Sequence, residues 1–190
     1  VRGLKQALIY SAPFPYGPAD KSARMDVSPR FFQTSMLNIA RRDALDQARA
    51  VLSIDIDELV VGPEGRSVYD AAVANRLGMA TIPGHWVYPA PNHEGPAPQS
   101  LHTYRAVPDA KTNGKWCMTP RGLMSRGFGW AVHKIGGVVQ VLFTRQNEFQ
   151  LLHCRSCSTG WKTGRYTNLH DLAEDPQLSA LMSRHFGDGA

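Results

Sequence analysis

The chain has 190 residues, of which 43% are hydrophobic and 19% charged. This composition supplies enough apolar material for a core and excludes an intrinsically disordered chain, and the lack of a repeat excludes collagen and coiled coils. The formal net charge is +5, with acidic residues concentrated over 43–70 and basic residues over 105–165. No apolar run reaches the roughly 18 residues that a membrane-spanning helix needs, and no signal peptide is visible. We expect one domain over residues 1–190 in a cytoplasmic protein, either free or at the inner face of the membrane.

The front of the chain alternates between short strands and helices. Residues 4–12 form a short apolar run that predicts a strand. Residues 31–50 carry apolar side chains at steps of three and four, which predicts an amphipathic helix. Residues 51–61, with the sequence VLSIDIDELVV, follow directly and predict one buried strand.

A second helix is predicted over residues 67–77, with Ser67 as its N-cap and Gly78 as its stop. Residues 79–89 predict another strand, interrupted at Pro83. The order helix, strand, helix, strand is typical of an α/β protein with a mostly parallel sheet flanked by helices.

The second half of the chain predicts smaller elements. A proline-rich loop spans residues 90–99 and a closing helix, which Pro176 divides, spans residues 168–186. Between them we expect three short strands, over residues 115–120, 131–143 and 149–155.

The acidic triplet at the end of the predicted strand 51–61 is the most specific chemical feature. Asp55 and Asp57 are two residues apart, so in a strand their carboxylates project to the same side, and Glu58 follows them. Two close carboxylates repel each other unless a cation lies between them, and Mg²⁺ or Mn²⁺ prefers such oxygen ligands. The alternative is an acidic turn without a ligand.

The segment FQTSMLNIARRDALDQARAVLSIDIDELVV resembles GT-A type glycosyltransferases of the family 2 and family 92-like group. The resemblance implies a GT-A-like fold in which Asp55 and Asp57 bind a divalent metal, Mn²⁺ or Mg²⁺, and through it the diphosphate of a nucleotide sugar. The group opens with further βα units that nothing here matches, which implies either a missing amino-terminal portion or a differently built base pocket.

Two later segments are compatible with the same resemblance. KWCMTPRGLMSRGFGWAVHKIGG matches the group at Lys115, Pro120 and His133, and LLHCRSCSTGWKTGR matches it at His153, Ser158, Trp161 and Lys162. His153 also ends an apolar strand, from which a neutral imidazole can reach the metal. Lys162 and Arg165 lie in a glycine-rich loop suited to capturing a phosphate, and a solvated basic loop is the alternative.

Three other groups of residues have alternative interpretations. An inverting enzyme needs a base, and Glu94 and Asp109 are the acidic side chains available between Asp70 and Glu148. His153, Cys154 and Cys157 resemble zinc ligands, but adjacent strand residues point apart and a fourth ligand is missing. An aromatic wall for stacking sugars, with core packing as the alternative, is predicted from His85, Trp86, Tyr88, His102, Tyr104 and Trp130.

We therefore expect a metal-dependent glycosyltransferase that moves a sugar from a nucleotide diphospho-sugar to a glycan, lipid or protein acceptor, as in surface polysaccharide or glycoconjugate synthesis. The metal would neutralise charge on the leaving diphosphate. The alternative function is a non-catalytic basic module for nucleic acid or another polyanion, because basic and aromatic side chains share the second half. Nucleic acid is the less favoured partner.

Overall fold

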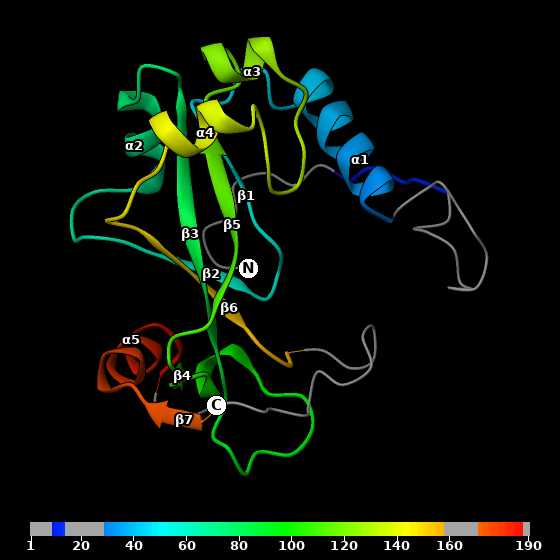
Figure 1. The fold of residues 1–190 in the computed structure, drawn as a ribbon. Helices are drawn as coiled ribbons and strands as arrows, with labels where there is room; N and C mark the ends of the chain where they lie inside the picture. The colour runs from blue at the N-terminus through cyan, green and yellow to red at the C-terminus, as the bar shows by residue number, and fades with distance from the viewer. Residues whose placement is uncertain (1–8, 14–28, 158–170, 188–190) are drawn as a thin grey trace.

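A computed structural model describes residues 9–13, 29–157 and 171–187. It contains a five-stranded sheet in the order β1-β5-β3-β6-β2 and a two-stranded sheet of β4 and β7, with helices packed around them (Figure 1). The strands are β1 (Val51–Ser53), β2 (Glu58–Val61), β3 (Met79–Val87), β4 (Tyr104–Val107), β5 (Lys111–Met118), β6 (Gln150–Cys154) and β7 (Asp171–Glu174). The helices are α1 (Pro29–Asp43), α2 (Val68–Ala74), α3 (Leu123–Gly127), α4 (Val138–Phe143) and α5 (Pro176–Phe186), with a 3-10 turn η1 (Gln99–Leu101).

The larger sheet is mixed, with most of its neighbouring strands antiparallel. Only β3 and β6 pair in parallel among the described strands of this sheet, whereas β1–β5, β5–β3 and β6–β2 are antiparallel. The α/β class is confirmed, but the expectation of a mostly parallel sheet is wrong for the described part. The alternation of helix and strand holds for the front of the chain, yet its strands are not neighbours, because β5 and β6 from the second half insert between them.

The predicted single strand 51–61 is divided in two. β1 lies at one edge of the sheet and β2 at the other, so the link Ile54–Asp57 leaves the hydrogen-bonded ladder to connect them. The Glu58 amide donates to the Asp55 carbonyl at 3.1 Å and closes a tight turn. Ile56, which periodicity places in the core, is therefore 98% exposed.

Several local predictions in the front half are confirmed. Ser67 caps α2 in a capping box with Asp70, which satisfies two amides at the helix start. α2 ends at Ala74 with Asn75 as its C-cap, so the prediction that Gly78 stops the helix is wrong, although Gly78 has a φ of +70°, a conformation that favours glycine. The pairing of β3 with β5 shifts its register around Pro83, which has no amide hydrogen to donate. α1 ends at Asp43, earlier than its pattern predicts.

The second half departs more from expectation. The predicted strand 131–143 contains no described strand, and its end forms helix α4 after Gly137 at a φ of +53°. Pro176 begins α5 rather than dividing a longer helix, because a proline lacks only an amide that the first turn leaves unused. The strand predicted over 149–155 is confirmed as β6. Of the strand predicted over 4–12, residues 9–12 are described and form no strand, and the rest lies outside the described residues.

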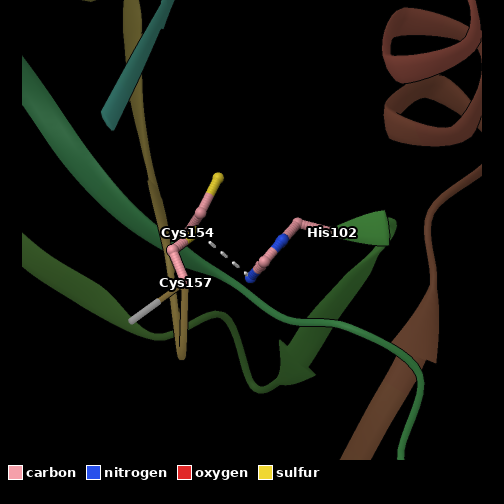
Figure 2. Close-up of side chains that lie close together, drawn as sticks. All are labelled: His102, Cys154 and Cys157. Carbon is pink, nitrogen blue, oxygen red and sulfur yellow. Dashed lines mark hydrogen bonds between the residues drawn. The ribbon is translucent and has the colours of Figure 1, made fainter. Parts of the chain in front are cut away.

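The core has three hydrophobic clusters distributed along the sheet. One packs α2 on β3, β5 and β6, a second surrounds Trp116 and Trp130, and a third packs α5 on β3 and β6. Beside the third cluster, at the end of β6, His102 lies close to Cys154 and Cys157 (Figure 2). In the described part of the chain, no helix has the length and apolar character needed to cross a bilayer.

Candidate functional site

The turn that carries Asp55 and Asp57 is fastened to two neighbouring segments. The Cys154 amide, at the end of β6, donates to the Asp57 carbonyl at 2.8 Å. The Gln99 side-chain amide, in η1, donates to the Ile56 carbonyl at 2.8 Å. These backbone contacts hold the acidic turn at the end of the sheet although it belongs to no strand.

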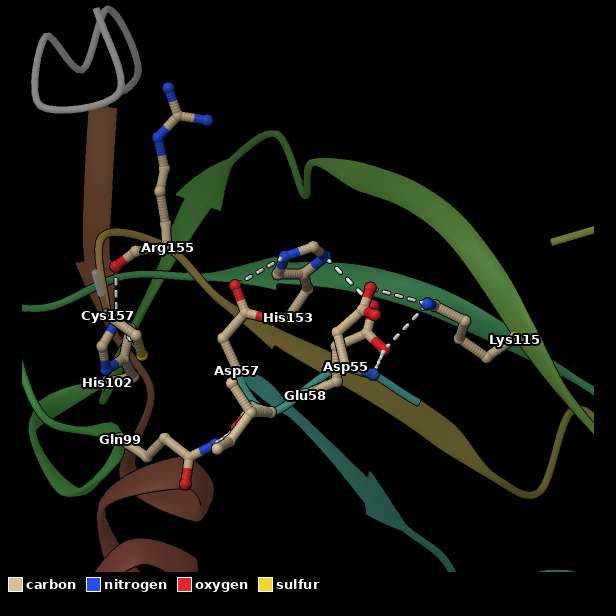
Figure 3. A network of polar contacts seen from close by, with 10 residues as sticks. Asp55, Asp57, Glu58, Gln99, His102, Lys115, His153, Arg155 and Cys157 are labelled. Carbon is tan, nitrogen blue, oxygen red and sulfur yellow. Dashed lines mark hydrogen bonds and ion pairs between the residues drawn. The ribbon is translucent and has the colours of Figure 1, made fainter. Parts of the chain in front are cut away.

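Five ionisable side chains, called here the charged row, form one continuous row at this end of the sheet (Figure 3). His153 lies between two carboxylates, with Nε2 at 3.3 Å from Asp57 Oδ2 and Nδ1 at 3.4 Å from Glu58 Oε1. Lys115 Nζ lies 3.3 Å from Glu58 Oε2 and 2.7 Å from Asp55 Oδ2. The row therefore runs from Asp57 through His153, Glu58 and Lys115 to Asp55.

Glu58 and Lys115 are buried in the middle of this row, whereas the Asp55 side chain is 43% exposed. Burial raises the pKa of Glu58, although the Asp55 amide, which donates to Oε2 at 2.7 Å, and the charge of Lys115 both act to lower it. A buried carboxylate needs a paired cation or a proton. Lys115 of β5 supplies that cation, and its side chain is itself almost fully buried.

The His153 ring is held by its surroundings as well as by the two carboxylates. It stacks on Trp86 of the neighbouring strand β3, with ring centroids 4.1 Å apart, and the Arg155 guanidinium lies over the same indole at 5.4 Å. His153 Nε2 and Glu58 Oε1 are buried and form no hydrogen bond with other described residues. The nitrogen that faces Asp57 is thus available to a further ligand.

The geometric expectations for the predicted metal-binding residues are met in part. His153 approaches Asp57 as predicted, and Asp55 and Asp57 join the same row of charges. The expected position at the end of a central strand is wrong, because β1 is an edge strand and both aspartates lie in the turn after it. The sequence analysis does not predict the pairing of Asp55 with Lys115. The available sign was a lysine at the start of the predicted strand 115–120, because a charged residue in a buried strand needs a partner of opposite charge.

The two candidate bases lie apart from this row. Asp109 pairs with His85 at 2.7 Å. His153 packs on Trp86, which is the next residue along β3. Because successive strand residues point to opposite faces, His85 and Asp109 lie on the other face of the sheet from His153. Glu94 lies on an exposed loop. Lys162 and Arg165, the predicted phosphate ligands, lie outside the described residues.

The predicted aromatic wall is not a surface. Tyr88, His102 and Trp130 are fully buried, and Trp130 packs against Trp116 in the core at a centroid distance of 5.2 Å. Trp86 of that set contacts the charged row through its stacking on His153.

A cavity of about 360 Å³ adjoins the exposed end of the row, at Asp55. It lies between α1 and the end of β1, and its walls include Phe32, Gln33 and Met36 of the helix and Ile54 of the turn. A small organic ligand in this cavity would therefore lie against the Asp55 carboxylate.

The cysteines that follow His153 have a different arrangement from the one that sequence suggested. His153 faces the carboxylates, and His102 takes the third position beside Cys154 and Cys157. The pKa of Cys157 is lowered to about 5, first by its hydrogen bond with Cys154 and then by His102. In contrast, burial raises the pKa of Cys117, in the core, to about 12.

Comparison with known proteins does not place the chain in a family. No family model matches it, and a search of curated proteins returns no match. The geometry of the charged row and the resemblance of its motifs are therefore the features that point to a function.

Proposed function

We propose that this protein is a metal-dependent glycosyltransferase with a GT-A-like fold that transfers a sugar from a nucleotide diphospho-sugar to an acceptor hydroxyl. The observation that carries the proposal is the approach of the buried His153 Nε2 to Asp57 Oδ2 at 3.3 Å. These two residues are 96 positions apart in sequence, and the resemblance assigns both to the metal.

The donor atoms fit a divalent metal of the Mn²⁺ or Mg²⁺ class. Asp57 offers a carboxylate and His153 offers a buried nitrogen without a hydrogen-bond partner among the described residues. Asp55, across the turn, is half exposed and adds a second carboxylate. An ion bound there would supply the positive charge that stabilises the departing diphosphate.

The neighbouring side chains position these donors. Glu58 lies beside His153 Nδ1 and Trp86 packs against the ring, so that Nε2 is directed at Asp57. Lys115 neutralises Glu58 and draws Asp55 toward the sheet. The row is therefore ordered before any ligand arrives, which lowers the cost of reorganisation on binding.

The same geometry supports a proposed place for each ligand. The cavity next to Asp55 is proposed for part of the donor, with its diphosphate toward Asp57. Lys162 and Arg165 are proposed to bind the phosphates. Glu94 and Asp109 remain the candidate bases, and the pairing of Asp109 with His85 favours Glu94 of the two.

Calorimetry with a panel of nucleoside diphosphates, with and without Mn²⁺, tests the proposal. We expect binding of at least one diphosphate that depends on Mn²⁺ and is lost in Asp57→Ala and His153→Ala. Asp46→Asn, which removes one exposed carboxylate outside the row, is the matched control and should bind normally.

Two results would contradict the proposal. One is the absence of Mn²⁺-dependent binding across the whole panel. The other is binding of oligonucleotides that weakens steeply with salt and ignores Mn²⁺, which would favour the polyanion-binding alternative.

A further inference from the structure

Three side chains of types that can bind a metal gather at the end of β6, next to the turn that carries Asp57. His102 directly follows η1, Cys154 is the last residue of β6, and Cys157 lies in the turn after it (Figure 2). One ligand atom from each of the three lies within 4.8 Å of the other two. His102 and Cys154 are fully buried and Cys157 is partly buried, so water is largely excluded from the cluster.

Backbone hydrogen bonds fix all three positions independently of the side chains. The Arg155 amide donates to the Val87 carbonyl at 2.9 Å, which holds the end of β6 against β3. The Ala97 amide donates to the Ser156 carbonyl at 3.0 Å, which joins the loop before His102 to the turn before Cys157. Ser156 has a φ of +68°, and this left-handed residue reverses the chain so that Cys157 returns toward Cys154.

One of the two hydrogen bonds of His102 suits a metal ligand. Nδ1 lies 3.0 Å from the Pro98 carbonyl, to which it can donate a proton, as the second nitrogen of most metal-bound histidines does. Nε2 faces Cys157 Sγ at 4.0 Å and the Arg155 carbonyl at 2.6 Å. A carbonyl oxygen only accepts, so the contact with Arg155 requires a proton on Nε2. Metal binding would remove that proton and replace the contact with the carbonyl by a bond to the ion.

We propose that His102, Cys154 and Cys157 form a site for a soft divalent ion of the Zn²⁺ class, with a water molecule as fourth ligand. Two thiolates and one imidazole are ligands that Zn²⁺ prefers, and three protein ligands with one open position are a common zinc arrangement. The two thiolates balance the charge of the ion, so the buried site is neutral. Binding releases the protons that the ligand side chains still carry to solvent, so affinity falls at low pH.

This site is distinct from the proposed Mn²⁺ or Mg²⁺ site and does not depend on it. Hard ions prefer the oxygen ligands of the aspartates, whereas a soft ion prefers sulfur. The two sites are adjacent, because Cys154 follows His153 and its amide donates to the Asp57 carbonyl. A zinc ion would also join the η1 segment to β6, and Gln99 of that segment holds the acidic turn.

Titration of the full chain with Co²⁺, under a non-thiol reductant and without oxygen, tests the proposal. We expect one Co²⁺ per chain to give a thiolate-to-cobalt charge-transfer band in the near ultraviolet and to be displaced by Zn²⁺; any Co²⁺ bound at the acidic site adds no such band. Cys157→Ser, at the partly exposed position, should weaken binding at least about 100-fold. Loss of a side chain that only supports a ligand already costs up to about 100-fold in metal affinity, so loss of a ligand should cost at least as much. His102→Asn should weaken it similarly and keep part of the thiolate band.

Two variants serve as controls. Cys117→Ala removes the third cysteine, which lies in the core away from the cluster, and should leave the band unchanged. Asp57→Ala should also leave it unchanged, which separates this site from the acidic one. A reduced wild-type chain that binds no Co²⁺, or one whose cobalt spectrum lacks the thiolate band or keeps it fully in Cys157→Ser, would overturn the proposal.

Discussion

Replacing Lys115 by methionine should destabilise the protein by about 3 kcal/mol at neutral pH. Methionine fills most of the buried space of the lysine stem but removes the ammonium group that lies 3.3 Å from Glu58 and 2.7 Å from Asp55. Removing one partner of a buried ion pair typically costs 3–5 kcal/mol, because the remaining charge stays buried without compensation.

The structure indicates the lower end of that range. Asp55 is 43% exposed, so its contact with Lys115 is screened by water and is worth at most about 1 kcal/mol. Glu58 is buried and dominates the loss, but it can take up a proton once the ammonium group is gone. The loss should therefore shrink as pH falls, because a protonated Glu58 no longer needs Lys115.

Urea titrations in EDTA measure these differences directly. Lys111→Met, at the exposed start of the same strand, is the matched control and should change stability by less than about 0.5 kcal/mol. Adding Glu58→Gln to Lys115→Met should recover at least about 1 kcal/mol, because contacting residues are energetically coupled. A Lys115→Met protein as stable as the control, or losses that simply add in the double variant, would refute the reasoning.

Three further predictions concern the same part of the fold. Asp57→Ala should change the free energy of unfolding in EDTA by no more than about 1 kcal/mol, because removing one of several close carboxylates relieves repulsion; a larger loss would show that Asp57 is a structural residue. Because burial raises the pKa of Glu58 above its usual 4.5, its contribution to stability is complete below that pH and is lost as pH rises through the raised pKa. Unfolding titrations from about pH 4 to about pH 8 should thus favour Glu58→Gln over wild type progressively, and a constant difference would contradict this. Ser67→Ala should cost about 1 kcal/mol by thermal or urea unfolding, and a neutral result would mean that the capping box adds nothing.

Local sequence signals predicted the elements whose causes are local. Ser67 marks the start of α2 because capping depends on the side chain of a single residue. The apolar run within residues 149–155 likewise predicts β6 from local sequence alone. The sequence predicts that Pro176 divides a helix over residues 168–186, whereas Pro176 begins α5. A proline inside an apolar pattern can have either effect.

The site depended on contacts that no local signal contains. Periodicity treats residues 51–61 as one strand, and it cannot show that β1 and β2 pair with different partners at opposite edges of the sheet. The proximity of Asp57 to His153 came from the motif resemblance, not from spacing. The position of His102 beside Cys154 depends on how the 88–103 loop folds back onto β6, and an isolated histidine gives no sign of that.

Mn²⁺ titration of protein carrying isotope-labelled histidine, followed by NMR, tests the central claim most directly. The chain has 7 histidines, and His153→Gln assigns the ring signals of His153 by their loss. Substoichiometric Mn²⁺ should broaden the His153 ring signals before those of the other histidines, and Asp57→Ala should abolish this selectivity. His153 signals that stay sharp while Mn²⁺ broadens other rings, or selective broadening that persists in Asp57→Ala, would contradict a shared metal site at Asp57 and His153.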